Sequence, residues 1–132
     1  MKTRTTTSWS AATLACGIVV TASGQSFVNF ESPHVHPIEV TPDGGMVLVA
    51  NTADNRLEII DRAGDGALRR RASVPVGLEP VAVRSFDDTT AWVVNHLSDS
   101  VTVVDLKNER VIATLRTGDE PADVVFAGSP MR

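Results

Sequence analysis

Leu48-Val49-Ala50-Asn51 and Trp92-Val93-Val94-Asn95 decide the fold, because each is a short apolar run that ends in asparagine. The two asparagines are 44 residues apart, and each is followed by a four-residue polar loop and a second apolar run. Those second runs end at Asp61 and Asp105, which are again 44 residues apart. Two landmarks that recur at one spacing indicate an internal repeat.

A second block recurs in the same order along the chain. Val76-Gly77-Leu78-Glu79-Pro80 matches Thr117-Gly118-Asp119-Glu120-Pro121 at a spacing of 41 residues. Pro37 lies 43 residues before Pro80, so His36 and Pro37 begin the first copy. The sequence therefore contains two complete copies and the start of a third.

Each copy carries four short strand signals separated by turn residues. The turn Thr41-Pro42-Asp43-Gly44-Gly45 is a strong one, because proline presets φ and glycine tolerates positive φ. The middle strands are nearly continuous apolar runs, which is typical of strands buried on both faces. The predicted strands are Ile38–Val40, Met46–Asn51, Arg56–Asp61 and Leu68–Val74, then Val81–Arg84, Thr90–Asn95, Ser100–Asp105 and Arg110–Leu115, with Ala122–Phe126 opening the third copy.

Four strands in a repeat of about 40–45 residues match a β-propeller blade. We predict an all-β fold with almost no helix: a partial β-propeller of two four-stranded antiparallel blades plus the first strand of a third. The expected blades are residues 34–77 and 78–118, and residues 119–132 start the next one. Residues 25–33 form an N-terminal strand and linker, in which Phe27–Phe30 is a candidate ring-closing strand.

A propeller ring needs about four to eight blades, so two blades leave the ring incomplete. The sequence therefore predicts the N-terminal piece of a longer protein, whose partners are the remaining blades in cis. A two-blade protomer that assembles with other protomers is the alternative.

The repeats resemble the YVTN family of β-propellers over roughly residues 34–126. Leu48–Asn51 and Trp92–Asn95 stand at the position of the Tyr-Val-Thr-Asn motif, although neither has its Tyr or Thr. The turn at 41–44 and the Gly-x-x-Pro stretches at 77–80 and 118–121 also match, whereas residues 85–88 depart from the turn motif. The resemblance implies an exported, non-catalytic binding or scaffold surface.

The first 24 residues have the features of a secretory signal peptide. Lys2 and Arg4 precede an apolar run, Ala11–Ala22, that is too short to cross a membrane. We expect cleavage between Gly24 and Gln25, with a cut after Ala22 as the alternative, and no stable transmembrane segment afterwards. The protein is then exported to the periplasm or the cell surface. A lipid anchor at Cys16 is a weaker alternative.

Composition excludes several classes of protein. A chain of 132 residues allows one domain, and its formal net charge of -4 argues against a nucleic-acid binder. A single cysteine excludes a disulfide scaffold. No nucleophile elbow or phosphate-binding glycine loop is present in the sequence, so we expect no catalytic residues and no cofactor.

Candidate binding residues follow from the repeat register. His36, Glu79 and Glu120 each precede the proline that opens a first strand, and first strands line the central channel of a propeller. These three side chains are therefore expected at equivalent places around one channel mouth, where they could hold a cation or a polar ligand. The opposing interpretation is that each Glu-Pro pair serves only the turn.

His34 and His36 are a weaker metal candidate. Side chains two apart share a face of a strand, and Glu31 is near, but Pro33 and Pro37 favour a turn instead.

Other repeated residues have structural interpretations. Asn51 and Asn95 are expected to cap tight loops, and Asp61, Asp105, Pro80 and Pro121 complete the repeated motif. Two alternative functions remain: the propeller domain of an exported enzyme or redox protein (lactonase-like or like haem-binding nitrite reductases), and a cell-surface adhesion or layer protein.

Overall fold

The structure is a computed structural model that describes residues 32–128. The predicted signal peptide, its cleavage site, Cys16, Glu31 and the candidate strand Phe27–Phe30 lie outside the described residues.

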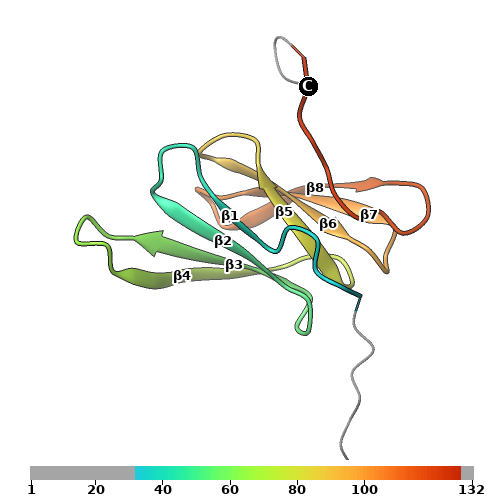
Figure 1. Cartoon of the computed structure of the whole chain (residues 1–132), viewed down its shortest axis with the longest axis horizontal. Helices are drawn as coiled ribbons and strands as arrows, with labels where there is room; N and C mark the ends of the chain where they lie inside the picture. The colour runs from blue at the N-terminus through green and yellow to red at the C-terminus, as the bar shows by residue number, and fades with distance from the viewer. Residues whose placement is uncertain (1–31, 129–132) are drawn as a thin grey trace, which may run out of the picture.

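Eight strands make two separate four-stranded antiparallel sheets, each paired in chain order (Figure 1). No helix occurs between residues 32 and 128. The first sheet, blade 1, contains β1 (Ile38–Val40), β2 (Met46–Asn51), β3 (Arg56–Arg62) and β4 (Leu68–Pro75). The second sheet, blade 2, contains β5 (Pro80–Ser85), β6 (Thr90–Asn95), β7 (Ser100–Asp105) and β8 (Arg110–Arg116). The prediction of an all-β fold with two four-stranded blades is confirmed.

The two blades share one apolar core. Leu48, Leu57 and Ile59 of blade 1 and Val93 and Val104 of blade 2 belong to the same cluster and have no exposed surface. Burial of each such side chain stabilises the fold by about 1.5–3 kcal/mol. The blades therefore pack face to face, as neighbouring repeats do.

The inner strands of the two blades run side by side. The backbone oxygen of Val81 accepts hydrogen bonds from the amides of Val35 and His36, and Val83 donates to the oxygen of His36 at 2.9 Å. This forms a parallel bridge between His36 and Ala82. The bridge places the start of blade 1 against β5.

The start of the third copy takes the corresponding place beside blade 2. Pro121 accepts a hydrogen bond at its oxygen from His96 Nδ1 at 3.2 Å, just as Pro80 accepts one from Thr52 Oγ1 at 2.7 Å. Val124 packs on the second apolar cluster, which belongs to blade 2. Ala122–Phe126 forms no strand, because no other strand pairs with it among the described residues. The segment nevertheless lies where a third blade would begin.

Candidate binding surface on the inner strands

Charged residues from three successive inner segments meet on one surface. Arg84, near the end of β5, makes two hydrogen bonds to Asp123, from Nη2 at 2.7 Å and from Nε at 3.1 Å. On its other side, Arg84 Nη1 lies 3.8 Å from Oε2 of Glu39 in β1. The guanidinium thereby joins blade 1, blade 2 and the start of the third copy.

His36 completes this charged network. Its Nε2 makes a hydrogen bond of 2.7 Å with Glu39 Oε2 and lies 3.3 Å from Arg84 Nη1. A proton on Nε2 lets the ring donate to the Glu39 carboxylate. One of the three residues predicted at a channel mouth is therefore in contact with charged groups of the inner strands.

The pairing of Arg84 with Asp123 shifts both groups toward their charged forms. The hydrogen bonds from Arg84 lower the pKa of the Asp123 carboxyl below its ordinary value. The same hydrogen bonds raise the pKa of the Arg84 guanidinium. The network therefore contains two carboxyl groups, those of Asp123 and Glu39, and one guanidinium, with the His36 ring beside them.

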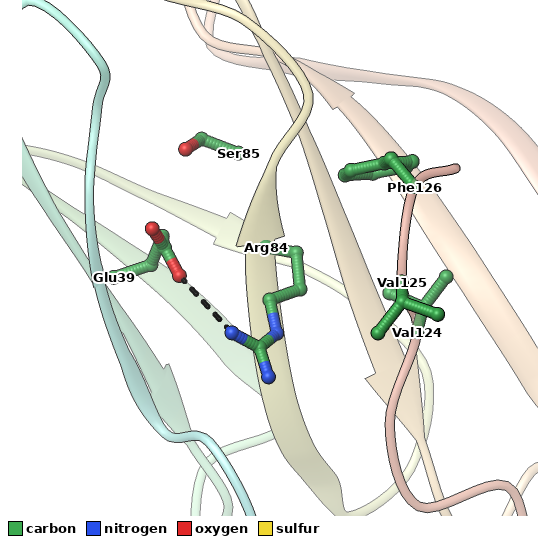
Figure 2. A pocket seen from close by; sticks show the side chains of 6 residues that line it. All are labelled: Glu39, Arg84, Ser85, Val124, Val125 and Phe126. Atoms are coloured by element: carbon green, nitrogen blue, oxygen red, sulfur yellow. Dashed lines mark ion pairs between the residues drawn. The ribbon is translucent and has the colours of Figure 1, made fainter. Parts of the chain in front are cut away.

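A shallow pocket of about 300 Å³ opens beside this network. Figure 2 shows Glu39 and Ser85 on one side of it, Arg84 between the two sides, and the apolar side chains of the third segment opposite. Glu39 makes both of its contacts in the network, with His36 and with Arg84, through Oε2. The pocket thus has a polar side, which carries the Glu39 carboxyl group, and an apolar side. Its lining residues are Glu39, Arg84, Ser85, Val124, Val125 and Phe126.

The apolar side is held in place by aromatic packing. Phe126 makes edge-to-face contacts with Phe86, at 5.0 Å between ring centroids, and with Trp92, at 5.4 Å. Edge-to-face pairs of this kind are favourable beyond their buried area. They fix the third segment against blade 2.

Glu79 and Glu120 do not join His36. Glu79 Oε2 accepts a hydrogen bond from Ser32 at 2.5 Å. The amide of Glu120 donates to Asp99, and its side chain is exposed. Among residues 32–128, no hydrogen bond or ion pair links any two of these three side chains, and each has partners of its own.

His34 and His36 also diverge. His34 Nε2 makes a hydrogen bond of 2.8 Å with Thr52, whereas His36 contacts Glu39. No group of three or more His, Cys, Asp or Glu side chains suited to a metal ion occurs in the part of the chain that the structure describes. The two rings have separate hydrogen-bonding partners because residues 32–35 do not form a strand, so the shared face assumed for them is absent.

The two repeated asparagines differ in role. Asn51 accepts a hydrogen bond from the Asp54 amide at 3.2 Å, which closes the loop after β2. Asn95 is fully buried, and its amide donates to Ser100 and Thr102 rather than to a loop backbone. The loop cap expected at Asn95 is replaced by a buried side-chain contact, because the serine and threonine of β7 lie within reach.

A pair of inter-blade contacts was not predicted. Asn55 Oδ1 accepts the amide of Glu79 at 2.8 Å, and Asp99 Oδ1 accepts the amide of Glu120 at 3.0 Å. All four residues have positive φ, which is costly for glutamate. The side-chain acceptors therefore help to hold both glutamates in this conformation. The sequence feature that could have revealed these contacts is the 44-residue spacing between Asn55 and Asp99.

No helix of membrane-spanning length and hydrophobicity was found in the searched residues, 32–128.

The chain matches no protein-family model and no curated protein. Among solved structures it is similar to Kuenenia stuttgartiensis hydrazine synthase, with 26% identity and a TM-score of 0.59 over 78% of this chain and 28% of that chain. It is also similar to a functionally unknown protein from Desulfotomaculum acetoxidans, with 20% identity and a TM-score of 0.63 over 68% and 31% of the two chains.

A third similar structure is the periplasmic gluconolactonase of Pseudomonas aeruginosa, with 24% identity and a TM-score of 0.61 over 70% of this chain and 28% of that chain. The chain spans about three tenths of the length of each of these structures. Together with the two antiparallel blades, these matches identify the fold as part of a β-propeller.

Proposed function

We propose that this chain is an exported propeller module of the YVTN type that serves as a non-catalytic binding surface, with its ligand site on the inner segments. The observation that carries the proposal is the pocket beside Glu39, Arg84 and Ser85. Inner strands face the axis of a propeller, where small ligands bind in many β architectures. The signal-peptide features of residues 1–24 support export, and the repeated motifs that end at Asn51 and Asn95 support the YVTN type.

The pocket fits a ligand with a cationic or hydrogen-bond-donating head and an apolar body. The carboxyl group of Glu39 on the polar side can accept a hydrogen bond from a cationic or hydrogen-bond-donating group. Val124, Val125 and Phe126 offer an apolar surface opposite. A primary ammonium on a short alkyl chain has this combination.

The test is a titration of the chain with n-butylammonium, in which changes in the NMR chemical shifts of the backbone amides report binding. Uncharged n-butanol is the matched control ligand. We expect n-butylammonium to shift the backbone amide resonances of Ser85 and Phe126. Glu39→Gln should weaken the binding of n-butylammonium at least about tenfold, because hydrogen bonds to charged groups contribute about 1.5–3 kcal/mol. Glu120→Gln is the control and should leave binding unchanged. Equal binding of the two ligands, or a loss caused by Glu120→Gln instead, would contradict the site.

A catalytic role is the second candidate, because two of the similar structures are named as enzymes. An assay of the exported protein for lactone hydrolysis, with and without a chelator, tests it. Hydrolysis that the chelator abolishes would replace the non-catalytic proposal.

A further inference from the structure

A second pocket, of about 300 Å³, opens at the end of β2 and in the turn that follows it. Its wall is mainly apolar, with Val49, Ala50 and Ala53 among the lining residues, and His34 and Glu58 add polar groups. It shares no lining residue with the pocket of the proposed function. We refer to it as the β2 pocket.

The second copy shows which side chain fills the matching space in blade 2. Gly77 lies directly over Asn95, because a Cβ added to this glycine would lie 2.6 Å from the Asn95 side chain. Asn95 is therefore able to turn inward, where it is fully buried and donates to Ser100 and Thr102. A residue larger than glycine above this asparagine would exclude that placement.

Blade 1 has such a larger residue. His34 stands 43 residues before Gly77, which is also the spacing of the prolines that open the two copies. Asn51, the counterpart of Asn95, turns instead to its loop and makes two hydrogen bonds with Asp54, at 2.9 Å and 3.2 Å. The space that an asparagine side chain fills in blade 2 is thereby left open beside His34, and the β2 pocket occupies it.

The neighbours of this asparagine also differ between the two copies. Ser100 and Thr102 are uncharged and buried, whereas the residues 44 positions earlier are Arg56 and Glu58, which are half-buried. Burying a charged side chain costs free energy unless the side chain keeps polar partners. The replacement favours a pocket that admits water or a polar ligand over a sealed apolar contact.

The hydrogen bonds of Thr52 determine which nitrogen of the His34 ring carries the proton. A hydroxyl group has one proton, and Thr52, which is buried, donates it to the backbone oxygen of Pro80 at 2.7 Å. In the 2.8 Å contact between Thr52 Oγ1 and His34 Nε2, the ring is therefore the donor. A neutral His34 ring then carries its proton on Nε2, and its Nδ1 is a hydrogen-bond acceptor.

We propose that the β2 pocket binds a phenol, a flat aromatic ligand with one hydrogen-bond-donating hydroxyl group, which donates to Nδ1 of His34. The ring of the ligand packs on Val49, Ala50 and Ala53, where the two small alanines let it lie close to the strand. This site goes beyond the proposed function and does not depend on the ligand site beside Arg84.

The lining residues favour a neutral donor over other small ligands. Among the described residues that line the β2 pocket, none is lysine or arginine, so an anionic ligand would find no cation there. An aromatic ligand without a donor would leave Nδ1 of His34 without a hydrogen bond. A phenol satisfies both the apolar wall and this acceptor.

Nitrogen-15 NMR of the full chain, titrated with phenol at about pH 8, tests the proposal, because histidine rings are neutral at about that pH. The chemical shifts of the ring nitrogens report which of them is protonated. We expect His34 to be protonated at Nε2, and phenol to shift the His34 Nδ1 resonance together with the backbone amides of Asn51 and Ala53. Fluorobenzene has a similar shape but no donor, so it should bind about three- to tenfold more weakly, the factor that one hydrogen bond between uncharged groups supplies.

A pair of histidine variants locates the hydrogen bond. His34→Phe keeps an aromatic ring and removes the acceptor, so phenol and fluorobenzene should then bind with equal affinity. His96→Phe is the matched control, because the His96 ring contacts Pro121 in blade 2 and lies outside the β2 pocket. This control should leave the preference for phenol unchanged.

Three results on the wild-type chain would overturn the proposal, and none of them needs a variant to fold. The first is a His34 ring that carries its proton on Nδ1. The second is equal binding of phenol and fluorobenzene, or phenol that leaves the amides around the β2 pocket unshifted. The third is a phenol-induced shift of Ser85 and Phe126 instead, which would place the ligand in the pocket of the proposed function.

Discussion

Position 77 accommodates only glycine unless neighbouring side chains rearrange. A Cβ at this position would contact the Ser98 hydroxyl and lie 2.6 Å from the Asn95 side-chain amide. Asn95 is buried and donates to Ser100 and Thr102, so it has little room to move. The constraint is steric, since Gly77 connects blade 1 to β5 directly over this side chain.

We expect Gly77→Ala to lower the free energy of unfolding by about 1–3 kcal/mol, the usual cost of forced overpacking. The matched control is Gly118→Ala, 41 residues later, where no heavy atom lies within 4 Å of the added Cβ. The control should change stability by less than about 0.5 kcal/mol. Urea unfolding of both variants is the measurement, and equal losses would refute the steric explanation.

At the scale of elements, segment 121–126 is held on blade 2 by the ion pair of Asp123 with Arg84, by two aromatic contacts of Phe126 and by the hydrogen bond from His96 to Pro121. Arg84 lowers the pKa of Asp123, so the ionised carboxylate stabilises the docked segment. This contribution is present above the ordinary aspartate pKa of about 3.9 and is lost as the pH falls through the lower pKa of the docked state. The ion pair is partly exposed, so its contribution is modest.

We therefore expect the segment to loosen as the pH falls from about 5 to 2, with a change in Trp92 fluorescence as Phe126 moves away. Asp123→Asn should produce part of the same change at pH 7. Asp119→Asn is the control, because Asp119 makes no ion pair in the described part of the chain and lies outside the docked segment. Fluorescence that is the same in Asp123→Asn and wild type would show that the ion pair does not fasten the segment.

The elements were largely predictable from the sequence, whereas the charged network was not. Repeated landmarks and turn residues placed each strand end to within about one residue. The register shifts at Ile59/Ile60 and Val103/Val104 occur 44 residues apart, so they belong to the repeat, yet no residue type marks them. They depend on how four strands twist together, which apolar patterning does not encode.

The candidate site escaped prediction for a different reason. The repeat register suggested His36, Glu79 and Glu120, but the structure brings His36 to Glu39 and Arg84 instead. Glu39 and Arg84 occupy different positions within their repeats, so self-similarity gives no signal for them. Only the packing of one inner strand against the next brings such residues together.

For the whole molecule, the two blades share one apolar core, so we expect them to unfold as one cooperative unit. Leu57 lies in β3 of blade 1, has no exposed surface and belongs to the cluster that contains Val93 and Val104 of blade 2. Repeats of this kind gain stability from the interface between neighbours as well as from within each repeat. A cavity at Leu57 therefore removes contacts from both sheets.

We expect Leu57→Ala to lower the free energy of unfolding by about 2–5 kcal/mol and to reduce amide hydrogen-exchange protection in β6 and β7 as well as in β2 and β3. Leu68→Ala, at a β4 position that is 59% exposed, is the control and should cost less than about 0.5 kcal/mol. If Leu57→Ala left protection in β6 and β7 intact, the blades would be independent units.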